Sequence, residues 1–160
     1  MGRPIAYGCV NEQVDNIEVW ADASQPWQAN GGKWVHLGEN TSRCAVLCSG
    51  TNTNNIIGWA EVGTYSSAST VGQDKITVNV HPVARFEMPI NATQTEQELR
   101  QLQGKVCDIE MVSGIQYANY DAATDKTLEI VGYKYYGEGT GEQSVEVRRY
   151  SITKSATMVA

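Results

Sequence analysis

Between residues 33 and 152 the chain alternates short runs of β-branched and aromatic residues with segments rich in Gly, Asn, Ser and Asp. A run of only a few such residues, bounded by turn residues, predicts a strand and not a helix. Eight runs fit this description: 33–37, 43–49, 55–62, 75–80, 83–88, 105–112, 127–133 and 144–152. Closely spaced short strands are typical of sandwiches and barrels. We therefore predict an all-β fold, either a β-sandwich or a tulip-like β-barrel.

One short helix is expected within residues 94–103. Thr95 and Glu98 have the spacing of a capping box, and Gly104 stands where a left-handed residue commonly ends a helix. The apolar residues of this segment are only Leu99 and Leu102. A helix with so narrow an apolar face is expected to cover one end or edge of the sheet.

Residues 1–30 differ from the rest of the chain because their apolar residues follow no period, and Pro26 interrupts them. We predict that residues 1–30 form an extended N-terminal arm with one or two short strands. Residues 31–152 would then form the β-rich domain and residues 153–160 a C-terminal tail. Large apolar side chains in a segment without its own core are expected to bind a partner's surface. In the arm these residues are Ile5, Ile17, Val19, Trp20 and Trp27.

The tryptophans of the predicted domain are assigned to a second surface. Alternation along a strand puts Val35 and Leu37 on one face. Trp34 and His36 then lie on the opposite face, which points toward a neighbour if the apolar pair points inward. We therefore predict a self-association surface formed by Trp34, His36 and Trp59.

Charge and cysteine content restrict the partners and the compartment. The formal net charge of −6 and a pI near 4.9 disfavour binding to nucleic acid or to an anionic membrane. Because the chain has no apolar run long enough to cross a bilayer, we expect a protein kept in a reducing cytosol. Its cysteines are then expected to be free thiols: Cys9, Cys44, Cys48 and Cys107. On one strand Cys44 and Cys48 would lie about 13 Å apart at ~3.3 Å per residue, too far to pair or to share a zinc ion.

Candidate catalytic groups are few. Cys48 could be a nucleophile if His36 or His81 lay within hydrogen-bond reach as its base, but nothing in the sequence brings them together. The glycines of residues 137–141 are spaced like a phosphate loop, yet a strand and not a helix is expected to follow them. We therefore predict no enzymatic activity, no metal and no cofactor.

The order of the predicted elements carries a resemblance. After an arm come 32–37, 56–60, 76–80 and 85–89, then the short polar helix, then 104–108, 128–132 and 145–147. Over residues 31–149 this order resembles the head decoration proteins of lambda-like tailed bacteriophages, although the arm and the domain are longer here. The resemblance implies a structural virion protein that binds the outside of a capsid and stabilises it. It also implies the major capsid protein as partner, a homotrimer, and assembly on the capsid surface in the host cytoplasm.

Two other functions remain open at the sequence level. A carbohydrate- or receptor-binding β-sandwich module of a phage particle would use outward aromatic rings. The candidates for such rings are Trp59, Tyr133, Tyr135 and Tyr136. A hydrolase with two acids contributed by distant strands would leave no local spacing in the sequence.

Overall fold

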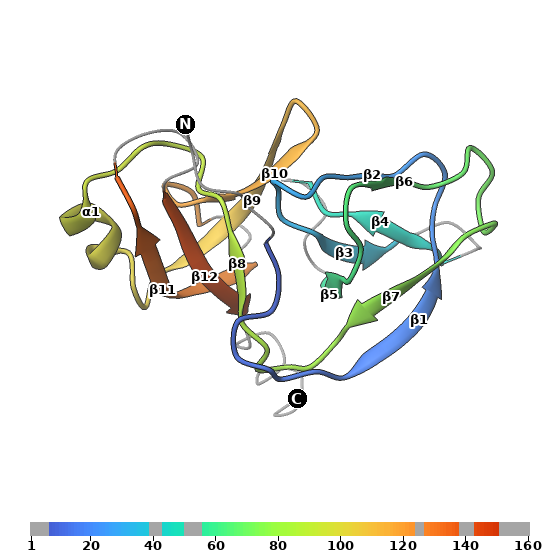
Figure 1. Cartoon of the computed structure of the whole chain (residues 1–160), viewed down its shortest axis with the longest axis horizontal. Coiled ribbons are helices and arrows are strands. Elements are labelled where there is room, and N and C mark those ends of the chain that lie inside the picture. Colours follow the sequence, from blue (N-terminus) through green and yellow to red (C-terminus); the bar gives the residue numbers. More distant parts are fainter. Residues whose placement is uncertain (1–6, 39–42, 50–55, 124–126, 138–142, 151–160) are drawn as a thin grey trace.

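The computed structural model describes residues 7–38, 43–49, 56–123, 127–137 and 143–150. These residues form twelve strands and one helix, which confirms the predicted all-β fold with one short helix. Ten of the strands form two five-stranded sheets, and the other two form a small ribbon. The two sheets lie side by side along the long axis of the molecule (Figure 1).

The first sheet occupies the right half of Figure 1. Its strands in spatial order are β1 (Asn16–Trp20), β7 (Lys75–Asn79), β5 (Ile56–Ala60), β3 (Trp34–Leu37) and β4 (Ala45–Leu47). All neighbours in this sheet are antiparallel. Just after β1, Ala21 forms a parallel bridge with Ala45 of β4, and the Asp22 N–H donates to the Ala45 carbonyl at 2.9 Å. The chain therefore returns to the far strand, and the sheet curls.

The curl of the first sheet encloses a small core, which we call the first core. The ribbon of β2 (Pro26–Trp27) and β6 (Tyr65–Ser66) contributes Trp27, whose ring stacks on Tyr65 with centroids 6.0 Å apart. The buried residues of this core are Ala21, Trp27, Val35, Ala45, Leu47, Ala60, Ile76 and Val78.

The second sheet and the helix occupy the left half of Figure 1. The strands in order are β10 (Ile115–Asn119), β9 (Val106–Val112), β11 (Leu128–Tyr135), β12 (Gln143–Arg149) and β8 (Phe86–Met88). A parallel bridge between Ile90 and Ala118 brings the chain after β8 back onto β10, so this sheet curls as well.

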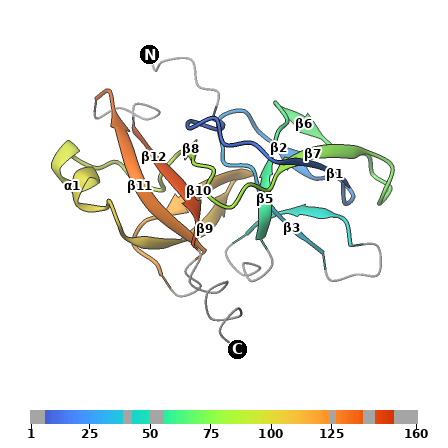
Figure 2. The same cartoon turned by 90° about the horizontal axis from the view of Figure 1, so that it is seen from below.

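Helix α1 (Glu96–Gln101) lies at the outer end of the second sheet, in contact with β11 (Figures 1 and 2). The predicted capping box between Thr95 and Glu98 is present, and Gly104 has a left-handed φ of +86°. Leu99 and Leu102 point into the core beneath. The placement predicted for the helix is confirmed.

A second core joins the two halves of the molecule. It lies within the second sheet, but Trp34 and Trp59 of the first sheet also point into it. The Trp59 ring stacks on Phe86 at 4.8 Å between centroids, and the Trp34 ring meets Phe86 edge to face at 5.1 Å. Because both sheets contribute to this core, neither sheet buries all of its apolar side chains without the other.

Two polar side chains also connect the sheets through backbone groups. The Gln116 Oε1 accepts from the Trp34 N–H at 2.9 Å, and its Nε2 donates to the carbonyls of Trp34 and Cys48, both at 3.0 Å. The Arg149 guanidinium donates to the carbonyls of Ile57 at 3.0 Å and Val80 at 2.8 Å. Because the Cys48 N–H also donates to the Trp34 carbonyl at 2.9 Å, the Gln116 amide bridges the Trp34 N–H and the Cys48 carbonyl where the pairing of β3 with β4 ends.

The predicted boundary at residue 30 needs correction. Within residues 7–30, β1 pairs with β7 over its whole length, and Trp27 is buried. The Asn79 side chain ties down the chain before β1, because its Oδ1 accepts from the Asp15 N–H at 3.1 Å. These residues have no period of their own because strands distant in the sequence supply their partners. The rest of the predicted arm, 1–6, and nearly all of the region after β12, 151–160, lie outside the described residues.

Candidate functional site

The residues predicted to bind a partner divide into exposed and buried groups. Trp20 is 47% exposed and Ile17 is 42% exposed, so both are available to a partner. Val19 is half-buried against the first core, and Trp27 is completely buried. Ile5 lies outside the described residues. Trp27 is therefore removed from the predicted binding surface because it forms part of a core.

The predicted self-association residues Trp34, His36 and Trp59 are all buried within this chain. The predicted alternation along β3 is present, but both faces of the strand are covered: Val35 enters the first core and Trp34 the second. The His36 Nδ1 lies 3.1 Å from the Leu37 carbonyl, and its buried Nε2 has no hydrogen-bond partner in the described part of the chain. The outward orientation predicted for Trp34 is wrong, and these residues offer no surface to a neighbour.

The aromatic rings considered for sugar binding are mostly covered. Trp59 is buried, and Tyr133 and Tyr135 are half-buried against the second core. Tyr136, which is 59% exposed, is the one fully exposed ring of the four. A single exposed ring is a weak basis for carbohydrate recognition.

Two buried cysteines, Cys48 and Cys107, do not have the character of nucleophiles. No disulfide joins any of the four cysteines, and Cys44 is buried as well. Burial raises the pKa of the Cys48 thiol far above its ordinary value, and burial together with Asp108 raises the pKa of Cys107 to about 12. Because the thiolate is the nucleophile, these side chains are inert at neutral pH.

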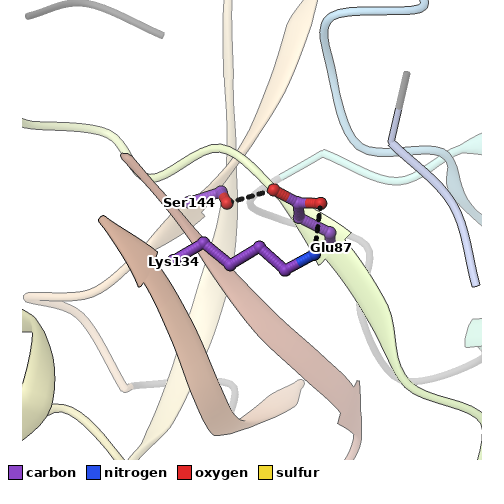
Figure 3. Close-up of polar contacts among 3 residues, drawn as sticks. All are labelled: Glu87, Lys134 and Ser144. Atoms are coloured by element: carbon purple, nitrogen blue, oxygen red, sulfur yellow. Dashed lines mark hydrogen bonds and ion pairs between the residues drawn. The ribbon is translucent and has the colours of Figure 1, made fainter. Parts of the chain in front are cut away.

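A buried polar cluster on the second sheet also deserves inspection as a site. The Ser144 hydroxyl donates to one oxygen of the Glu87 carboxylate, and the Lys134 Nζ lies 3.4 Å from the other (Figure 3). The three residues come from β12, β8 and β11, so the cluster ties three strands together. Since Ser144 is completely buried, no substrate reaches its hydroxyl. We interpret the cluster as structural.

The described residues contain neither a metal-binding cluster nor a helix that could span a membrane. No group of three or more His, Cys, Asp or Glu side chains among the described residues could hold a metal ion. The described helix, which has six residues, is too short to cross a bilayer.

The edges of the sheets differ in how they are covered. At the β8 edge, Cys9 bridges Phe86, and at the β10 edge Ile90 bridges Ala118. At the β4 edge, the Leu47 N–H donates to Gln25 Oε1 at 2.9 Å, next to the bridge from Ala21. At β1 the bridge from Ala21 to Ala45 covers only the end of the strand, and along Asn16–Val19 no strand among the described residues pairs with the outer side.

The ladder between β1 and β7 shows which backbone groups face outward. The Val80 N–H donates to the Asp15 carbonyl at 2.8 Å, and the Ala21 N–H donates to the Asp74 carbonyl at 2.7 Å. In an antiparallel pair such positions recur at every second residue. The amides and carbonyls of the alternate residues therefore point away from β7. These residues are Asn16, Glu18 and Trp20.

We call residues 12–20 the open edge. Besides Ile17 and Trp20 it carries Val14, which is 54% exposed. Its acidic residues are also exposed, namely Glu12, Asp15 and Glu18. The chain has no Lys or Arg between Arg3 and Lys33. The open edge thus combines outward backbone groups, exposed apolar side chains and negative charge.

Comparison with protein-family models, with curated proteins and with solved structures finds no match for this chain. The open edge is therefore the candidate functional site on the geometry of this chain alone.

Proposed function

We propose that the protein is a structural protein of a bacteriophage particle that binds the outside of the capsid and stabilises it, as decoration or cement proteins do. The observation that carries the proposal is the open edge, where backbone groups that could pair with another strand are exposed between Ile17 on one face of β1 and Trp20 on the other.

The way the body is joined supports a mechanical role. The shared second core and the bonds of Gln116 and Arg149 connect the two sheets. Two sheets connected in this way are expected to move as one body. A cement protein needs this property, because it must hold its shape when the capsid subunits around it shift. The net charge of −6 suits a protein on the outside of an assembly, away from packaged nucleic acid.

The proposed partner is the major capsid protein, and the proposed location is the capsid surface. Weak contacts at many repeated sites would act together, since multivalent attachment increases the overall affinity. We also propose a homotrimer, because the resemblance to lambda-like head decoration proteins implies one. Because Trp34, His36 and Trp59 are buried, such a trimer would have to use other surfaces.

The test uses empty capsids assembled from the major capsid protein encoded in the same genome. Capsids are heated with and without the protein, and their rupture is followed by light scattering. We expect the protein to bind and to raise the rupture temperature. Trp20→Ala should weaken binding by about 2 kcal/mol, as for an interface hot spot, whereas the matched control Tyr136→Ala should not. Failure of the wild-type protein to bind would overturn the proposal.

A further inference from the structure

The open edge carries exposed acidic side chains but lacks three other protections that are common on exposed strands. Proteins commonly protect an edge with a bulge, a proline or an inward charge. β1 pairs with β7 in an unbroken register of five residues, and residues 12–20 contain no proline. Along Asn16–Val19, before the chain reaches the bridge of Ala21 with Ala45, the outer side of β1 can thus accept another strand.

The side chains of β1 determine what that strand should carry. Ile17 and Val19 lie opposite Val78 and Ile76, on the face that adjoins the first core. A strand added beside β1 would place apolar residues there, next to the exposed part of Ile17. Cross-strand pairs of apolar side chains stabilise such an arrangement.

The other face of β1 calls for positive charge. Glu18 and Trp20 lie there, opposite Thr77 and Lys75, and the Lys75 Nζ is 5.0 Å from the centre of the Trp20 ring. Lys75 is the only cation of β7, against the three exposed acids of the open edge. Lys or Arg on the added strand would pair with Glu18 and lie near the Trp20 ring.

A second copy of this chain fits the open edge poorly. Two antiparallel β1 strands would bring their acids together, with Glu18 facing Glu18 when the pair is centred on that residue. Like charges directly opposite each other destabilise a strand pair. Charge complementarity therefore favours a different chain.

We propose that the open edge binds an extended segment of a partner protein, which adds to the first sheet beside β1 and alternates apolar residues with Lys or Arg. The segment belongs to the capsid protein insofar as the inference rests on the proposed function. Strand addition itself requires only the geometry of β1. Backbone bonds would supply the affinity, and the alternation would supply the specificity.

The first test measures binding of a peptide of about seven residues that alternates Val and Lys, with a Val and Glu peptide as control. The full chain is used, and amide hydrogen exchange follows each residue. The outward amides of Asn16, Glu18 and Trp20 should become protected on binding. Those of Ile17 and Val19 should be protected already, because they bond to β7. Equal binding of both peptides, or protection elsewhere, would overturn the inference.

Two variants of Glu18 separate the contribution of backbone hydrogen bonds to peptide binding from the contribution of charge. Glu18→Ala removes a charge and should weaken binding of the Lys peptide several-fold. Glu18→Pro also removes an outward donor without breaking a bond to β7, so its binding should fall by about tenfold more. An unchanged unfolding temperature checks the fold of each variant. If both variants bind equally, strand addition is overturned.

Capsids and sedimentation then distinguish the failures. If the protein binds the peptide but does not bind capsids, the proposed function is wrong, while strand addition stands. If capsids bind Glu18→Pro as well as the wild type, the proposed function stands and the inference fails. A dimer of the free protein that protects the same three amides would make a second copy the occupant and overturn the inference.

Discussion

The two sheets of this protein treat their edges differently. In the second sheet both edges are covered by short neighbouring segments, through Cys9 on β8 and Ile90 on β10. In the first sheet the bridge from Ala21 to Ala45 covers the β4 edge and the end of β1, whereas the outer side of Asn16–Val19 is open, next to the exposed side chains of Ile17 and Trp20. Uncovered strands invite pairing with other chains, so folded proteins normally protect them. The open part of β1 is therefore the place where we propose that a partner strand binds.

The largest effect is expected at the joint between the two sheets. Trp59→Ala should lower the free energy of unfolding by about 3–5 kcal/mol, because it empties a large volume between Trp34 and Phe86. Since both sheets share this core, urea unfolding followed by fluorescence and by circular dichroism should show one coincident transition. Two separate transitions would mean that the first and second sheets fold independently.

Gln116→Leu should have the next largest effect. The substitution removes the partner of the Trp34 N–H and of the Cys48 carbonyl in a buried place, whereas the Trp34 carbonyl keeps the Cys48 N–H. Buried backbone groups without a partner are costly, and we expect a loss of about 2–4 kcal/mol in the free energy of unfolding. Thermal unfolding provides the measurement. A stability equal to that of the wild type would contradict the role of Gln116 as a hydrogen-bond bridge between Trp34 and Cys48.

A smaller effect on stability is expected at Glu87 of β8, in the second sheet. Glu87→Gln weakens the charged bonds to Lys134 and Ser144 and should cost about 1–3 kcal/mol. The matched control is Glu129→Gln, which removes a more exposed ion pair with Arg148, where N and O are 2.9 Å apart. That control should change stability by less than about 1 kcal/mol. Equal losses in urea unfolding would show that burial does not distinguish the two sites.

Local patterns were enough to predict most of the second sheet and its helix. The capping box and Gly104 placed α1, and apolar runs placed β9, β11 and β12. The strand β10 was missed because Gln116 and Asn119 dilute its apolar character. The turn before it carried a signal: Ser113 and Gly114 both have positive φ, of 51° and 80°, as a two-residue hairpin turn requires.

The open edge could not be predicted in this way. Trp20 was expected to bind a partner because it lies in an irregular segment, and it is exposed. By the same reasoning Trp27 was expected to be exposed, but β6 covers it through Tyr65. Whether a residue of this segment is buried depends on strands some forty or more residues further along the chain. Local periodicity contains no information about such partners.

The bonds that join the two sheets have a consequence for the evolution of this fold. The acceptors of Arg149 are the backbone carbonyls of Ile57 and Val80, and all three partners of Gln116 are backbone groups. Backbone groups stay in place when the side chain at their position changes. The partner positions can therefore drift in sequence while the joint persists. Substitutions at Ile57, Val80 and Cys48 should therefore leave the bonds of Arg149 and Gln116 in place, provided that the new side chains fit the packing around them.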